Sequence, residues 1–142
     1  MSNVLAKIRQ HRADVHYLMT DLADRIVEAA EHHDESKLQP DELKGYEKYN
    51  PLLAKAGFNS PEYYKLKEGL RPTRELHKSR NRHHPEHFEN GISGMNLIDL
   101  LEMFADVVAG CKARGIPIEN NLKESGIPRE IISIFMNTLD EL

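Results

Sequence analysis

The sequence predicts an all-α protein with six or seven helices joined by short loops. Apolar residues recur at intervals of three and four along most of the 142 residues, which is the period of an α-helix. No stretch shows the sustained alternation of apolar and polar residues that a half-buried strand requires. Proline and glycine fall between the periodic segments, where helices are expected to begin and end.

Two helices are expected before residue 34. The first has an apolar face that carries Val4, Ile8, His11, Val15, Leu18 and Leu22. Thr20 can cap the second helix. The shared face of that second helix carries Leu22, Ile26, Ala29 and His33. Each helix therefore places a histidine among its core residues, and Asp34 follows the second helix directly.

Proline in a first helical turn predicts four further helices. Their expected ranges are 40–49, a short helix from 61, 72–82, and a last helix from 128. The most apolar helix is expected from Leu97 to about Ala113, because Gly115 and Pro117 follow it. These segments complete the predicted set of six or seven helices.

Composition excludes several classes of protein. The length suits one domain over residues 1–142 around a single core. No apolar run approaches the roughly 20 residues of a membrane span, so no membrane partner is expected. The N-terminus lacks a secretory pattern and Cys111 is the only cysteine, which indicates the cytoplasm. With 19 Lys and Arg against 23 Asp and Glu, extended nucleic-acid binding is not expected, while homo-oligomers stay open.

Asp99, Glu102 and Asp106 form an acidic stripe on the apolar helix. They are its only charged residues between positions 97 and 111, and their spacing aligns them along one side. The stripe borders the apolar face, so its edge is expected to be partly buried, where an uncompensated carboxylate is costly. Either solvent, a Lys or Arg from a neighbouring helix, or a metal ion must meet these groups.

Histidine supplies the other half of a predicted metal site. His11, His33 and Asp34 offer two imidazoles and a carboxylate, ligand types that suit Mn, Fe, Co, Ni or Zn. A single histidine on an apolar face can equally be a hydrogen-bonded core residue. The doublet of His33 and Asp34, together with the acidic stripe, favours the metal interpretation.

A basic segment with four histidines spans residues 71–91. On a helix His77, Asn81 and His84 would share one face. The cations around them are Arg74, Arg80 and Arg82. Such a surface suits an anion beside a metal, although a solvated basic face would have the same composition. Lys37 is a further candidate to contact a phosphate.

The order of these residues resembles the ligand order of the HD superfamily of metal-dependent phosphohydrolases. The chain is also similar, over roughly residues 5–110, to small phage and bacterial proteins of unassigned function. The motifs shared with that family are HDESK at 33–37, NRHH at 81–84 and EMFAD at 102–106. The resemblance implies a compact HD-like helical bundle. The first metal would be held by His11, His33, Asp34 and Asp106, and His77 and His84 would bind a second metal or the leaving group.

This resemblance implies a metal-dependent phosphohydrolase that acts on a phosphate ester, such as a nucleotide, through activated water. One or two divalent ions of Mn, Co, Ni, Fe or Zn are expected as cofactors. The expected substrate-binding residues are Lys37, Arg80, Asn81 and Arg82, and the expected catalytic residues are Lys37, His77 and Glu102. Two alternatives stay open: an HD-fold di-iron oxygenase, and a non-catalytic domain that binds a nucleotide or a protein.

Overall fold

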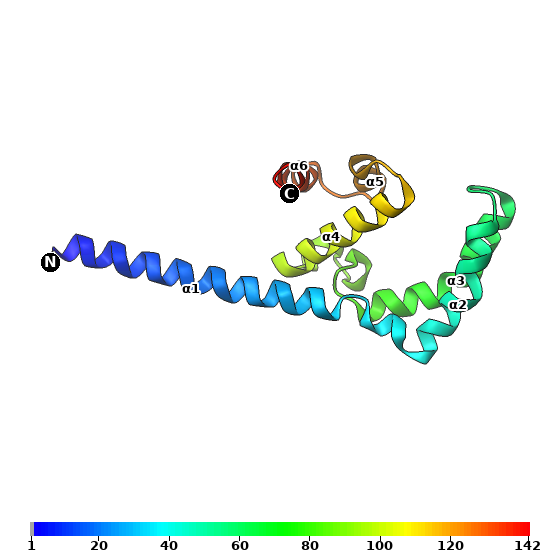
Figure 1. The fold of residues 1–142 in the computed structure, drawn as a ribbon, viewed down its shortest axis with the longest axis horizontal. Coiled ribbons are helices and arrows are strands. Elements are labelled where there is room, and N and C mark those ends of the chain that lie inside the picture. Colours follow the sequence, from blue (N-terminus) through cyan, green and yellow to red (C-terminus); the bar gives the residue numbers. More distant parts are fainter. Residues whose placement is uncertain (1) are drawn as a thin grey trace. The chain divides into compact units, whose positions relative to one another are not determined.

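The computed structural model describes residues 2–142, and these residues form helices and loops without strands. The α-helices are α1 (Asn3–His32), α2 (Pro40–Lys55), α3 (Pro61–Arg80), α4 (Leu97–Arg114), α5 (Ile118–Glu124) and α6 (Arg129–Asp140) (Figure 1). Three short 3-10 helices lie between them: η1 (Glu35–Leu38), η2 (Pro85–His87) and η3 (Gly91–Gly94). The predicted all-α class is confirmed. Among these helices none combines the length and the apolar character needed to cross a lipid bilayer.

The chain divides into two units, residues 1–33 and residues 34–142. The first unit is α1, a single helix where the sequence predicts two. Thr20 does not cap a second helix, because its hydroxyl donates to the carbonyl oxygens of His16 and Tyr17, 2.9 Å away in each case. That bond is compatible with a helix interior, and no proline or glycine interrupts residues 3–32. The predicted break is therefore wrong.

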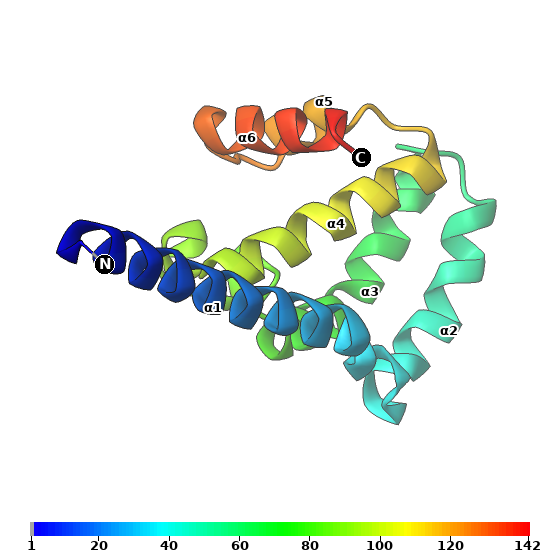
Figure 2. The same cartoon turned by 60° about the vertical axis from the view of Figure 1, so that its left-hand side comes forward.

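In the second unit α2 and α3 run side by side (Figure 2). The two helices approach closely at Gly45 and Gly69, where an added Cβ would clash with the side chains of Thr73 and Tyr49. The sequence predicts that α2 ends near Pro51 and that a new helix starts at Pro72, but both prolines lie inside helices. A proline costs one backbone hydrogen bond, and the packing between α2 and α3 outweighs that local preference.

The apolar core of the second unit lies between α4, α5 and α6. Phe104 of α4 stacks on Phe135 of α6 with ring centroids 4.5 Å apart. The other buried members of this core are Met103, Leu122, Ile127 and Ile132. One side of α4 packs into this core. The acidic stripe lies on another side of the helix and therefore faces other segments. The single-domain assignment of residues 1–142 stays a prediction.

Candidate metal centre

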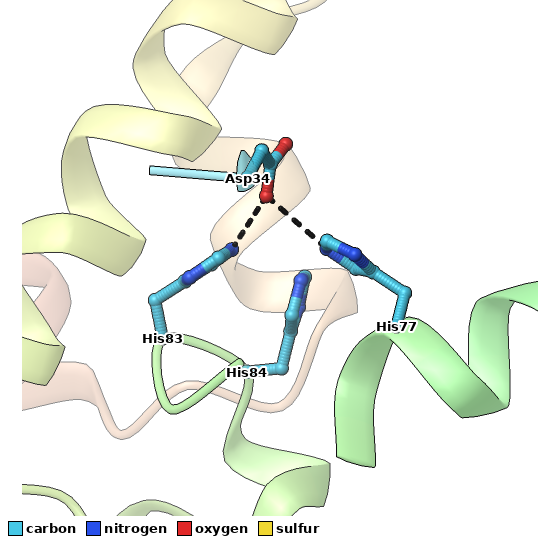
Figure 3. A group of neighbouring side chains, drawn as sticks. All are labelled: Asp34, His77, His83 and His84. Atoms are coloured by element: carbon cyan, nitrogen blue, oxygen red, sulfur yellow. Dashed lines mark ion pairs between the residues drawn. The ribbon is translucent and has the colours of Figure 1, made fainter. Parts of the chain in front are cut away.

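Four side chains of the second unit converge on one point: Asp34, His77, His83 and His84 (Figure 3). Each offers one ligand atom, and these four atoms lie within 4.8 Å of one another. Asp34 Oδ1 lies 3.1 Å from His77 Nε2 and 3.3 Å from His83 Nε2. His77 and His83 are buried, whereas Asp34 and His84 are half-buried. We call this group the metal cluster.

The backbone brings these residues together from two directions. Asp34 precedes η1 with a φ of 55°, in the left-handed region that aspartate tolerates better than most residues. His77 lies in the last turn of α3, and the chain then turns so that His83 and His84 face it. The ring centroid of His84 lies 5.0 Å from that of His77 and 4.2 Å from that of His83. A helix end and the loop that follows it therefore supply all three imidazoles.

Two carboxylates hold two of the imidazoles from behind. Glu42, which is fully buried, has its Oε2 2.9 Å from His77 Nδ1. Glu102 Oε1 lies 3.0 Å from His83 Nδ1. An imidazole that donates its Nδ1 proton to a carboxylate presents the lone pair of Nε2, and metal-binding histidines are commonly supported in this way. In both cases Nε2 is the atom that enters the metal cluster.

The electrostatics of the cluster favour a cation. Burial alone would raise the pKa of Asp34, but His77, His83 and Lys37 hold the pKa of that carboxyl well below its usual range. Burial opposes protonation of His77, yet Asp34 and Glu42 raise the pKa of this imidazole. Burial, followed by the neighbouring imidazoles, lowers the pKa of His84 to about 3. At neutral pH the cluster therefore combines a carboxylate with a neutral imidazole, the protonation states that metal ligands need.

A divalent transition metal fits these residues. His84 Nε2 is buried and has no hydrogen-bond partner among the residues that the structure describes. A buried polar atom without a partner is costly, and a metal bond would satisfy it. Three imidazole nitrogens and one carboxylate oxygen are the donors that Mn, Fe, Co, Ni and Zn accept, whereas Mg and Ca prefer oxygen alone.

A family model described as a family of unknown function (DUF5662) matches residues 1–140. The chain belongs to this family. No curated protein and no solved structure matches the chain. The match covers nearly the whole sequence of this DUF5662 member, including every residue of the metal cluster.

The three carboxylates of the acidic stripe in this DUF5662 chain contact different partners. Asp99 accepts two hydrogen bonds from Arg82, at 3.1 and 2.9 Å, and also caps the start of α4. Glu102 binds His83, and Asp106 Oδ2 lies 3.9 Å from His83 Nε2. The stripe therefore meets an arginine at one end and His83 of the metal cluster at the other, and the metal interpretation of the stripe stays a prediction.

Two predicted ligands lie in the first unit. His33 follows the last residue of α1 and directly precedes Asp34. His11 and His33 lie 22 residues apart at the two ends of a continuous helical stretch, which corresponds to about 33 Å along the axis. The expectation that they meet is wrong, because the helix break on which it depended does not exist. Within one chain His11 and His33 cannot bind the same ion.

Three predicted substrate-binding residues have partners within the protein. Arg80 pairs with Asp41 and, at 3.2 Å, with Glu42. Asn81 donates to the carbonyl oxygen of His77 at 2.7 Å and to Ser36 Oγ at 2.8 Å. Arg82 donates two hydrogen bonds to the carboxylate of Asp99 at the start of α4. These contacts position the surroundings of the metal cluster, and a direct role in substrate binding stays a prediction.

Lys37 is the predicted substrate-binding residue that lies at the metal cluster itself. Its Nζ is 2.5 Å from Asp34 Oδ2, and its side chain is 40% exposed. The same ammonium lies 5.4 Å from the ring centroid of Tyr46, whose ring packs edge-on against His77. Burial, with help from Glu42 and Asp34, raises the pKa of Tyr46 to about 12. An accessible cation and a neutral phenol therefore border the cluster.

Replacing Arg82 with glutamine is expected to lower the free energy of unfolding by about 1–3 kcal/mol, because Asp99 is 7% exposed and would lose its charged partner. Urea denaturation measures this change. The control is Arg71→Gln, whose partners Glu68 and Glu75 are exposed, so that its loss should stay below about 1 kcal/mol. Equal losses in the two variants would contradict a structural role for Arg82.

Proposed function

We propose that this protein is a metal-dependent phosphohydrolase that acts on a phosphate ester, with nucleotides as the first class of substrate to test. The observation that carries the proposal is the convergence of Asp34 Oδ1 with Nε2 of His77, His83 and His84. The resemblance of the His33-Asp34 doublet and the later Asp106 to the HD superfamily supports the choice of reaction, while His11 has no part in it. Lys37 beside the same cluster supports an anionic substrate.

The ion would be held by Asp34 and the three imidazoles of the metal cluster. When bound, a divalent transition metal makes water acidic enough to supply hydroxide near neutral pH and polarises a phosphoryl oxygen. No protein nucleophile is then needed. Glu42 and Glu102 keep the Nδ1 protons of His77 and His83 in place. The lone pairs of both Nε2 atoms therefore stay available to bind the metal.

Two further side chains can serve the reaction. The Lys37 ammonium can neutralise phosphate oxygens, since it is partly exposed and borders the cluster. Glu102 is engaged by His83, which leaves Asp106 as the carboxylate of the acidic stripe that is most open to solvent. Asp106, with a side chain that is 38% exposed, is the better placed of the two to accept a proton from the attacking water.

Metal-dependent phosphate release is the result expected from protein purified without a metal-affinity tag. Elemental analysis should find a transition metal, and a screen of nucleotides under nitrogen should show phosphate release that chelation abolishes and Mn or Co restores. The Asp34→Asn variant is the negative control, because it removes the carboxylate of the metal cluster.

Other outcomes of that screen would overturn the proposed reaction. Turnover that requires iron and consumes oxygen would assign the centre to an oxygenase. Bound metal with no phosphate release from any nucleotide would favour the non-catalytic alternative. A protein that binds no transition metal and whose melting temperature ignores chelator would remove the metal centre altogether.

A further inference from the structure

Helices α2 and α3 meet in a fixed antiparallel register beside the metal cluster. Glu42 Oε2 lies 2.9 Å from His77 Nδ1. One turn later in α2, the backbone of Gly45 packs against the side chain of Thr73, which lies one turn earlier in α3. Tyr46 follows Gly45 directly and packs edge-on against His77. Tyr46 therefore lies opposite the turn of α3 that precedes His77.

Two cations lie close to Tyr46. The ammonium of Lys37 is 5.4 Å from the centroid of its ring. Arg74 belongs to the turn of α3 opposite Tyr46. Burial and nearby carboxylates raise the pKa of Tyr46 to about 12, and the positive charge of Arg74 partly opposes this increase. The Tyr46 hydroxyl forms no hydrogen bond with another residue that the structure describes, so it can donate to a ligand.

Arg74 differs from the other cations of the basic segment at residues 71–91. Each of the others pairs with a carboxylate: Arg71, Lys78, Arg80 and Arg82. Arg74 has no ion pair or hydrogen bond among residues 2–142. No acid lies one turn away from it on α3, where the neighbours are Leu70, Arg71, His77 and Lys78. Like charges at this spacing repel each other, so an anion bound at Arg74 would stabilise this part of the helix.

A hollow of about 500 Å³ opens beside Arg74 on the surface of α3. Four cations line it: Lys67, Arg71, Arg74 and Lys78. The two acids in the lining, Glu68 and Glu75, both bind Arg71. The hollow therefore combines a positive charge with space for an anionic group. A guanidinium suits phosphate especially well, because its parallel N–H groups can bind two phosphate oxygens at once.

We propose that Arg74 and the Tyr46 hydroxyl bind a second phosphate group of the substrate, next to the phosphate that Lys37 and the metal cluster hold. The substrate class is then a nucleotide with at least two linked phosphate groups. A nucleoside monophosphate would leave Arg74 without a partner. This inference rests on the proposed function for the position of the first phosphate, and we call the position of the second one the second-phosphate site.

The second-phosphate site can be tested with the hydrolysis-resistant methylene analogues of AMP and ADP, which differ by one phosphate group. Calorimetric titration of the full chain with excess Mn should show about ten-fold tighter binding of the ADP analogue. Arg74→Gln should remove this preference and change the affinity for the AMP analogue by less than about two-fold. Tyr46→Phe keeps the ring beside Lys37 and should remove part of the preference.

The matched control is Arg71→Gln, which changes a cation of the same helix and the same hollow. Arg71 is already paired with Glu68 and Glu75, so this variant should keep the full preference for the ADP analogue. Unchanged metal content in Arg74→Gln would show that the metal cluster is intact. No binding of the ADP analogue, equal affinity of the wild type for both analogues, or equal effects of Arg74→Gln and Arg71→Gln would overturn the second-phosphate site.

The phosphate-release screen separates a failure of this site from a failure of the proposed reaction. A preference for the ADP analogue that depends on Arg74, without phosphate release from any nucleotide, would support the second-phosphate site and overturn the hydrolysis. Metal-dependent release from monophosphates, together with equal affinity for the two analogues, would support the hydrolysis and overturn the second-phosphate site.

Discussion

Replacing His84 with alanine is expected to abolish tight binding of a divalent transition metal and, with it, any phosphate release. His84 Nε2 is a buried nitrogen atom, and no other described residue forms a hydrogen bond with it. Loss of one of four ligands should reduce metal affinity by more than the roughly 10- to 100-fold typical of a lost supporting group. Titration of metal-free protein with Mn or Co, followed by calorimetry, measures this effect.

Thermal unfolding gives a second measurement of the same variant. Metal that binds only the folded state stabilises it by about 2.7 kcal/mol at 100 times the dissociation constant. The wild-type protein should gain this stability on adding metal, and His84→Ala should not. Without metal the two proteins should melt within a few degrees of each other, because the substitution removes a polar atom that had no partner.

Two other histidines serve as controls for this prediction. His87 lies in the same segment, but its Nδ1 is 3.0 Å from the carbonyl oxygen of Lys78. His16 is an exposed residue of α1. Alanine at either position should leave metal content unchanged. Full metal binding by His84→Ala, or equal losses in the control variants, would show that the metal cluster is not the binding site.

The helical class could be predicted because it depends on a local period, whereas several helix boundaries could not. Threonine caps a helix or bonds to a carbonyl one turn earlier, and the sequence does not distinguish the two roles at Thr20. Pro51 and Pro72 are strong local signals for helix ends. Both were overridden by packing between α2 and α3, which depends on residues distant in the sequence.

The metal cluster was predicted in part. The resemblance implied Asp34 as a ligand of the first metal and His77 and His84 as ligands of a second metal or of the leaving group, whereas the structure brings all three to one point. His83 was missed, because the helical face expected to carry His77 and His84 excludes the residue next to His84, whereas α3 ends at Arg80 and both histidines of the following loop turn inward. Glu42 was missed too, since an acid in a first helical turn is ordinarily explained by the helix dipole. Its contact with His77 joins residues 35 positions apart, beyond any local pattern.

Glu42→Gln is expected to reduce metal affinity by about 10- to 100-fold, the range for losing a carboxylate that supports a metal-binding histidine. The substitution conserves volume at a fully buried position. An amide accepts the Nδ1 proton of His77 more weakly than a carboxylate does, so Nε2 becomes a poorer donor. Arg80 keeps Asp41 as a partner, so the guanidinium is not left without a counter-charge.

The neighbouring substitution Asp41→Asn separates this effect from a loss of structure around Arg80. Asp41 and Glu42 both bind Arg80, but only Glu42 contacts His77. Competition with a metal-sensitive dye should therefore give less than a three-fold change for Asp41→Asn. If the two variants lose affinity equally, Arg80 and not the bond to His77 supports the cluster. If Glu42→Gln binds metal like the wild type, His77 does not need the carboxylate to act as a ligand.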